Sequence, residues 1–492
     1  MKTKSNIKKN FAYQMIYEIL VLILPFVTSP YIARVIGAEG LGTYSYSYSV
    51  AYYFVLFSML GIKNYGNRAI ARVRDDEKRL NDTFSNIAAL HVFISVICCI
   101  GYIIYILCIN GDEKLYAEIQ ILYVLSGLFD ISWFYFGIEN FKLTVTRNII
   151  IKIINVVCVF TFVKTENDLW KYCLIMALGY LISQISLWIP LRKYVKLVAP
   201  SWEKMKIHLK PMVVLFIPAI AVSLYKYMDK IMIGLLSSKT QLGYYENAEK
   251  VINIPMTIIS SFGTVMLPKM SNLAVSHNSQ ASKRYIMLSM EFVMCLAFAL
   301  TFGLAGVGTI FAPLFWGNQF ILSGYLIMGL AVTIPFVSFA NVIRTQYLIP
   351  NALDREYISS VIAGAVVNLI INALFIPKLG AFGAMLGTIG AEIVVCIWQS
   401  TVVKNQLPIT KLLKVSLPFL PAGIVMFMFV YCIGKYMGNG IVTLIVQIGL
   451  GSMFYGVYCM VYFYKTKNEV VMNMYKKIKL SRKKHDRQNI SK

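Results

Sequence analysis

The stretch NIAALHVFISVICCIGYIIYILCI, residues 86–109, decides the fold class of this chain. It contains no Asp, Glu, Lys or Arg. A helix of about 20 apolar residues spans the hydrocarbon core of a bilayer. Backbone groups cannot go unpaired in lipid, and this run does not alternate as a barrel strand does. We therefore predict a transmembrane helix here.

Similar apolar runs occur along the whole chain, and together they predict an all-α integral membrane protein with about 14 transmembrane helices. The expected spans are residues 11–36, 41–62, 86–109, 116–137, 145–163, 170–190, 211–236, 242–268, 286–311, 321–348, 357–376, 382–403, 412–434 and 440–464. Composition agrees with this. Hydrophobic residues make up 58% of the chain and charged residues 14%, whereas soluble domains carry about 25% charged residues.

The net charge of +24 indicates a membrane topology rather than a nucleic-acid partner. If the N-terminus is cytoplasmic, 36 of the 47 Lys and Arg residues fall in inside segments, 6 in outside loops and 5 within spans. This bias predicts that both termini are cytoplasmic. The basic tail, residues 465–492, would then lie at the inner surface beside anionic membrane lipids.

No motif in the sequence indicates an enzyme, a cofactor or a metal site. The nine cysteines are scattered and the four histidines lie far apart. There is no phosphate-binding loop and no HExxH or GxSxG motif. The predicted outside loops are too short to hold a catalytic domain, and no cleavable signal peptide is visible.

A weak internal repeat divides the expected spans into two halves. Ile36-Gly37 is followed by Leu41-Gly42-Thr43-Tyr44, and Ile233-Gly234 by Leu242-Gly243-Tyr244-Tyr245. Transporters commonly build a central site between two repeated bundles. We expect a six-helix bundle over residues 1–200, a second over 201–408, an added helix pair over 409–464 and the basic tail over 465–492.

Charged residues inside spans indicate a candidate substrate site, because such charges are costly in lipid and usually face the bundle interior. Lys226, Asp229 and Lys230 lie within two turns of one expected helix. Arg34 and Lys250 are further candidate cations, and Asp229, Glu246 and Glu249 are candidate coupling groups or charge partners. One interpretation is a cationic cavity for an anionic substrate. The other is a set of salt bridges that only join helices.

Tyrosines form a second feature. Tyr44, Tyr48 and Tyr52 recur every four residues on the second expected span. Tyr48 and Tyr52 lie deeper in this span, where their rings could stack on sugar faces. The alternative is a belt of tyrosines at the membrane interface, where Tyr is enriched.

Four segments resemble the Wzx-type flippases of O-antigen and capsule repeat units. They are PFVTSPYIARVIGAEGLG (25–42), YGNRAIA (65–71), DISWFYFGIE (130–139) and IPKLGAFGA (376–384). The resemblance covers essentially the whole chain and is most specific in its first 80 residues.

The resemblance implies the architecture of the multidrug/oligosaccharidyl-lipid/polysaccharide exporters, with two six-helix bundles in a V and alternating access. The implied substrate is an oligosaccharide on undecaprenyl pyrophosphate, flipped across a bacterial cytoplasmic membrane. The implied partners are membrane lipids and a polysaccharide polymerase. Two other functions stay open at this point: a peptidoglycan lipid-precursor flippase and a cation-coupled multidrug exporter of the same superfamily.

Overall fold

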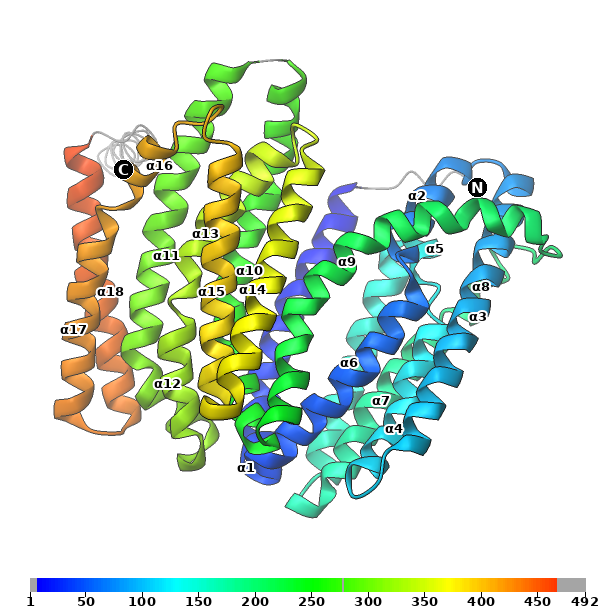
Figure 1. The fold of residues 1–492 in the computed structure, drawn as a ribbon, viewed down its shortest axis with the longest axis horizontal. Helices are drawn as coiled ribbons and strands as arrows, with labels where there is room; N and C mark the ends of the chain where they lie inside the picture. The colour runs from blue at the N-terminus through cyan, green and yellow to red at the C-terminus, as the bar shows by residue number, and fades with distance from the viewer. Residues whose placement is uncertain (1–6, 277, 467–492) are drawn as a thin grey trace, which may run out of the picture. The chain divides into compact units, whose positions relative to one another are not determined.

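A computed structural model describes residues 7–276 and 278–466, and every element in this part of the chain is a helix (Figure 1). The described residues form two compact units. The first holds residues 7–254, 315–326 and 357–395, and the second holds 255–276, 278–314, 327–356 and 396–466.

The first unit contains the N-terminal helices and two later stretches of the chain, residues 315–326 and 357–395. Its elements are α1 (Ile7–Met59), α2 (Ile62–Val73), α3 (Glu77–Cys108), α4 (Glu113–Leu128), α5 (Ser132–Gly137), α6 (Phe141–Phe162), η1 (Glu166–Asp168), α7 (Leu169–Ile185), α8 (Trp188–Leu191), α9 (Trp202–Leu236), the first part of α10 (Lys239–Val275), η2 (Asn318–Phe320), the start of α12 (Ile321–Leu330), and most of α14 (Asp354–Leu379) and α15 (Ala381–Val402).

The second unit contains the rest of α10 and α12 and most of α11 (Ser279–Trp316). It also holds α13 (Thr333–Ile343), η3 (Arg344–Leu348), α16 (Ile409–Ser416), α17 (Phe419–Met437) and α18 (Ile441–Lys465). The last two helices lie side by side (Figure 1), where Gln447 Nε2 donates to the Val430 carbonyl at 2.8 Å. Tyr455 Oη donates to the Cys295 carbonyl at 2.8 Å and so joins α18 to α11.

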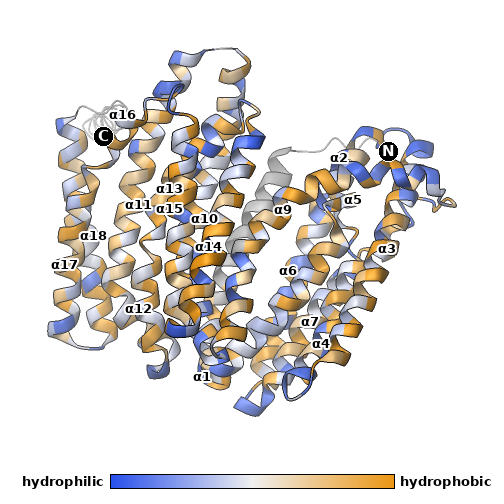
Figure 2. Ribbon diagram, in the orientation of Figure 1, coloured by the Kyte–Doolittle hydropathy of each residue, from blue (hydrophilic) through white to orange (hydrophobic). Residues whose placement is uncertain are grey.

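The chain is an all-α integral membrane protein. Eleven described helices are long and apolar enough to cross a membrane, or twelve if α12 and α13 form one bent span. These correspond to the twelve spans expected from residue 86 onward. Figure 2 shows hydrophobic residues along α3, α4, α6 and α7. The total of fourteen spans, the division at residue 200 and the cytoplasmic termini stay predictions. From residue 467 the predicted tail lies outside the described residues.

The first two expected spans are joined in α1, a run of 53 residues. The helix is interrupted at Gly37, where φ is 71° and ψ is −178°. Glycine adopts this positive φ without a Cβ penalty, so the chain changes direction there without leaving helical structure on either side.

Helix α2 was not expected, because its residues fall in a polar segment between two spans. Ile62, Gly66 and Ile70 recur every four residues and are buried on one face. At Gly66 a Cβ would lie 2.5 Å from a ring carbon of Trp133, so only glycine lets α2 approach α5 this closely. The indole and Ile70 belong to a buried apolar cluster.

Candidate functional site

The site is organised by a close crossing of α1 and α10 in the first unit. A Cβ added to Gly42 would lie 1.6 Å from the Lys239 carbonyl oxygen, and one added to Gly243 would lie 1.9 Å from the Ala38 carbonyl oxygen. Small residues let membrane helices approach at backbone distance. The two Leu-Gly segments of the sequence repeat therefore pack directly against each other.

One turn beyond this crossing, the two helices bring charged groups together. Ser45 Oγ on α1 donates to Glu246 Oε2 on α10 at 2.9 Å. The Lys230 ammonium on α9 lies 2.7 Å from Glu246 and 2.9 Å from Glu249. Lys250 lies 3.5 Å from Glu246, one turn along α10. We call Lys230, Glu246, Glu249 and Lys250 the charge cluster.

The charge cluster is largely shielded from solvent, except for Lys250 with its 37% exposed side chain, and it is internally balanced. The side chains of Lys230 and Glu246 are 12% and 16% exposed. Removing an ion from water costs several kcal/mol, and here each charge has an opposite charge within 4 Å that offsets part of this cost. Two cations face two carboxylates, so the cluster itself carries no net charge when all four groups are ionised.

The other two predicted cations lie outside this network. Lys226 is exposed and forms no ion pair with any side chain that the structure describes. Arg34 is exposed on the other side of the Gly37 break, and its Cγ lies near Gly317, 3.7 Å from where a Cβ of that glycine would be. The structure thus brings Lys230 and Lys250 together with the glutamates and places Arg34 and Lys226 separately.

Asp229 faces away from the charge cluster into a polar network between α9, α10, α14 and α15. Its carboxylate accepts hydrogen bonds from Asn372 Nδ2 at 2.6 Å, Thr388 Oγ1 at 2.9 Å and Tyr245 Oη at 3.0 Å. The residue is 1% exposed. A carboxylate surrounded by neutral oxygen and amide groups has the chemistry to exchange a proton or a small hard cation. Among the described residues, no group of three His, Cys, Asp or Glu side chains is placed to hold a metal ion.

Tyr48 and Tyr52 lie in a cluster of rings inside the first unit. The rings of Tyr52 and Tyr227 stack at 3.8 Å, and those of Tyr48 and Tyr123 at 4.8 Å. Tyr180 lies 6.1 Å from Tyr48. The Tyr44 ring centre lies 5.9 Å from that of Tyr48 and 4.8 Å from that of Tyr172. We call these seven residues the tyrosine cluster. The Lys230 ammonium lies 5.5 Å from the centre of the Tyr227 ring, so the tyrosine cluster and the charge cluster are in contact.

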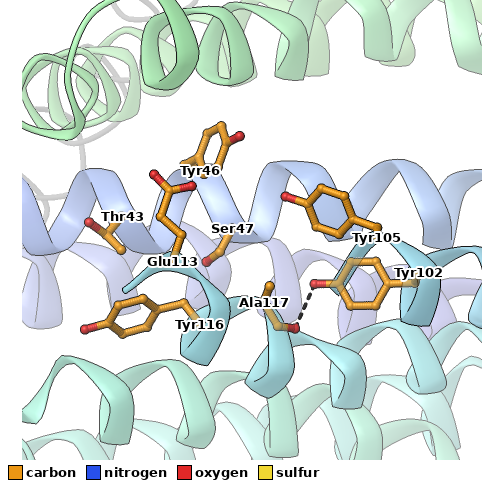
Figure 3. Close-up of a pocket in the computed structure, with 8 residues that line it drawn as sticks. All are labelled: Thr43, Tyr46, Ser47, Tyr102, Tyr105, Glu113, Tyr116 and Ala117. Atoms are coloured by element: carbon orange, nitrogen blue, oxygen red, sulfur yellow. Dashed lines mark hydrogen bonds between the residues drawn. The ribbon is translucent and has the colours of Figure 1, made fainter. Parts of the chain in front are cut away.

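A second ion pair joins the N-terminal ends of α4 and α10. Lys239 Nζ lies 2.9 Å from Glu113 Oε1 and 3.2 Å from the centre of the Tyr46 ring. Figure 3 shows Tyr46 and Glu113 close together in the lining of a small cavity, which Tyr102 and Tyr105 also line. On the predicted topology these ends face outward, so the Lys239–Glu113 pair would hold the outer ends of the two helices together.

Comparison with known families decides where this arrangement belongs. A model of the family described as polysaccharide biosynthesis protein matches residues 7–274, which are more than half of the chain and include the charge cluster. The chain belongs to this family.

Related proteins agree with this family assignment. A protein of Shigella dysenteriae described as an O-antigen transporter is 22% identical over 405 residues, which are 81% of this chain and 100% of the relative. A protein of Escherichia coli (strain K12) with the same description is 21% identical, over 82% of this chain and 98% of the relative. Agl15 of Haloferax volcanii, described as a low-salt glycan biosynthesis flippase, is 25% identical over 33% of this chain and 34% of the relative. The resemblance to Wzx-type flippases is confirmed, and this polysaccharide biosynthesis protein is a membrane transporter.

Solved structures share the fold. The lipid II flippase MurJ in an inward closed conformation superposes with a TM-score of 0.77 at 15% identity, over 93% of this chain and 100% of that chain. An inward-facing multidrug resistance MATE family transporter of the MOP superfamily gives a TM-score of 0.61 at 14% identity, over 79% and 95% of the two chains. At these identities the similarity establishes the fold alone.

Several residues of the site were missed at the sequence level. The three partners of Asp229 are uncharged, so a search for charged residues within spans does not find them. They are Tyr245, Asn372 and Thr388. A weak signal existed for α14, where Asn368 and Asn372 lie one turn apart on an otherwise apolar span. Tyr123 and Tyr180 lie on spans whose tyrosines show no periodic pattern with Tyr48.

Proposed function

We propose that this polysaccharide biosynthesis protein translocates an oligosaccharide repeat unit linked to undecaprenyl pyrophosphate from the inner to the outer face of a bacterial cytoplasmic membrane. The observation that carries the proposal is the contact between the charge cluster and the tyrosine cluster. It places groups suited to a diphosphate beside groups suited to sugars. The membrane-transporter family and its relatives support the same function.

The cations act on the diphosphate in this proposal. Lys226, with its exposed ammonium and no carboxylate partner among the described side chains, makes the first contact. Lys230 and Lys250 are released to the substrate when the diphosphate competes with Glu246 and Glu249. Because the glutamates recover both lysines once the diphosphate leaves, the pairing keeps substrate affinity from becoming too high for release. Arg34 acts as a further cation along the path.

The sugars pass through the water-filled interior while the polyprenyl chain stays in lipid. Tyr48 and Tyr52 present ring faces on which sugar rings stack during the passage. The protein exposes this path to the two sides of the membrane in turn, by alternating access. Asp229 couples the change between these states to a proton or a small cation. The protein works beside a polysaccharide polymerase, which consumes the flipped unit.

The experiment is deletion of the gene, followed by extraction and measurement of lipid-linked glycans in sealed vesicles of known orientation. Accumulation of a specific oligosaccharide lipid on the cytoplasmic face, together with loss of surface polysaccharide, supports the proposal. Accumulation of a peptidoglycan precursor would instead favour the lipid-precursor flippase. Sensitivity to cationic drugs without any glycan lipid would favour the multidrug exporter.

A further inference from the structure

The segment of residues 192–210 is strongly basic and leads into α9. It contains six Lys or Arg residues and one acidic residue, Glu203. Four of the six cations are exposed and form no ion pair with any side chain that the structure describes. They are Arg192, Lys193, Lys206 and Lys210. The proposed transport site uses none of these charges.

Helix α3 holds this segment in place. Three backbone N–H groups between residues 196 and 201 donate to side chains of α3 at 3.0, 3.0 and 2.9 Å. The acceptors are Asn81, Ser85 and Asn86. Lys196 adds an ion pair with Glu77 at 3.5 Å, and Lys204 adds one with Asp82 at 2.6 Å. The exposed cations therefore stand on a backbone that is fastened to a membrane helix.

The first part of α9 lies against α2 and α3 (Figure 1) and has two different faces. Met205 and Met212 are seven residues apart and are buried in the apolar cluster that α2 also joins. Trp202, Lys206 and Lys210 recur every four residues on another face, and all three are exposed. The Lys206 ammonium lies 5.5 Å from the centre of the Trp202 ring. We call Trp202, Lys206 and Lys210 the α9 surface.

Trp202 lies where the lipid-facing side of α3 begins. Its ring packs edge-on against Phe93 of α3, with the ring centres 6.0 Å apart. The two residues are 53% and 51% exposed, and Val96, Ile97 and Ile100 continue an exposed apolar side along α3. Tryptophan is enriched at the membrane interface, because its ring is apolar and its N–H group is polar. This position puts the α9 surface at the boundary between hydrocarbon and lipid headgroups.

The charge and the position of the α9 surface together favour an anionic lipid as its partner. On the predicted topology, residues 191–210 are cytoplasmic, and the cytoplasmic leaflet contains anionic lipids that attract nearby lysines. Lys206 and Lys210 share a face with Trp202, so their ammonium groups reach the depth of the headgroups. An acidic protein or a nucleic acid would contact the lysines but would not need an indole at the edge of a lipid-facing helix.

We propose that the α9 surface binds anionic phospholipids of the inner leaflet, with the headgroup phosphate at Lys206 and Lys210 and the upper part of the lipid against Trp202. The inference goes beyond the proposed function and adds regulation by lipid composition. Helix α9 continues to Lys226 and Lys230. A lipid bound at its start therefore steadies the helix that carries both of these cations.

The test is fluorescence quenching by brominated lipids, with the full-length protein in bilayers. The probes are phosphatidylglycerol and phosphatidylcholine, each brominated on its acyl chains. Because the chain has six tryptophans, every variant is measured with and without Trp202→Phe, and the difference reports Trp202 alone. Size-exclusion profiles establish that each variant is folded.

Three double variants are compared with the wild type. Lys206→Gln with Lys210→Gln removes both charges, and Lys206→Arg with Lys210→Arg keeps them. The matched control is Lys411→Gln with Lys414→Gln, which removes two exposed lysines from α16 instead.

We expect Trp202 of the wild type to prefer phosphatidylglycerol over phosphatidylcholine by roughly fivefold or more, because each lysine adds attraction to an anionic headgroup. The preference should disappear in the double glutamine variant of α9 and persist in the double arginine variant and in the control. Equal quenching by both lipids in the wild type overturns the proposal, as does a preference that survives in the double glutamine variant. Quenching by neither lipid also overturns it and would favour a soluble acidic partner.

The quenching result does not depend on what the protein transports, so it stands or fails separately from the proposed function. Transport in liposomes tests the regulatory step. With wild-type protein, flipping should slow when phosphatidylcholine replaces phosphatidylglycerol, and the double glutamine variant of α9 should be slow in both lipids. Equal flipping by the wild type in the two lipids would contradict regulation through the α9 surface.

Discussion

Gly42 and Gly243 lie against each other where α1 crosses α10, and neither position has room for a side chain. A Cβ on Gly42 would lie 3.0 Å from the Gly243 nitrogen and 1.6 Å from the Lys239 carbonyl oxygen. The two glycines occupy corresponding places in the sequence repeat. Their contact brings Ser45 to Glu246 and so positions the charge cluster.

Replacing either glycine by alanine should disturb this crossing. Because the neighbouring atoms are backbone, the helices must separate, and we expect Gly42→Ala and Gly243→Ala each to lower the melting temperature by several degrees. The melting temperature of the double variant should fall by less than the sum of the two single decreases, because both changes disturb one contact. Gly456→Ala in α18 is the control, since no atom lies within 4 Å of the place that its Cβ would take. Equal melting temperatures of Gly42→Ala, Gly243→Ala and Gly456→Ala would refute a tight crossing of α1 and α10.

Lys230 should contribute to stability as well as to transport. Lys230→Met leaves Glu246 and Glu249 facing each other without their shared cation, which typically costs about 3–5 kcal/mol. Adding Glu246→Gln and Glu249→Gln should restore the melting temperature but not polysaccharide export. Export that returns together with stability would mean that the charge cluster only joins helices.

Lys226 should separate transport from stability, because it is exposed and has no ion pair among the described side chains. Lys226→Ala should melt like the wild type and reduce export, and Lys226→Ala with Lys230→Ala should abolish export while the protein still inserts. Lys226→Arg should be tolerated better than Lys226→Glu. Equal loss from the last two variants would indicate packing rather than charge.

Asp229→Asn should keep the fold and change the coupling. The substitution preserves shape, and the one amide oxygen can still accept from Thr388 and Tyr245, while an NH2 group replaces the oxygen that accepts from Asn372. We expect export in sealed vesicles to lose its response to an imposed proton or sodium gradient. A variant that responds to the gradient as the wild type does would remove Asp229 from the coupling step.

The Lys239–Glu113 pair should behave as an electrostatic contact. Lys239→Glu places two carboxylates opposite each other and should lower export, and Lys239→Glu with Glu113→Lys should restore much of it. The cation–π contact with Tyr46 is not restored by the exchange, so recovery should be partial. No recovery at all in a folded double variant would argue against the ion pair as the functional contact.

The membrane fold could be predicted because lipid leaves few choices. A run such as residues 86–109 must form a helix, and the structure places α3 there. Two features of the fold were not predicted, each for a local reason. Gly37 interrupts α1 without a polar loop, and α2 is amphipathic, so its Ile62, Gly66 and Ile70 pattern lies within a segment of mixed polarity.

The site could be predicted only in part, because its pairings are distant in sequence. The search for charged residues within predicted spans identified Lys230 and Glu246. The sequence does not show, however, that two glutamates would converge on one lysine. The partners of Asp229 on α14 and α15 are 143 and 159 residues away and uncharged.

The most direct test of the central claim is flipping by the purified protein in liposomes. Undecaprenyl pyrophosphate carrying the oligosaccharide is included in the bilayer, and a membrane-impermeant glycosidase is added outside. We predict that the glycan protected in the inner leaflet becomes accessible with wild-type protein and stays protected with Lys226→Ala plus Lys230→Ala. Glycan that stays protected with folded wild-type protein would contradict the account.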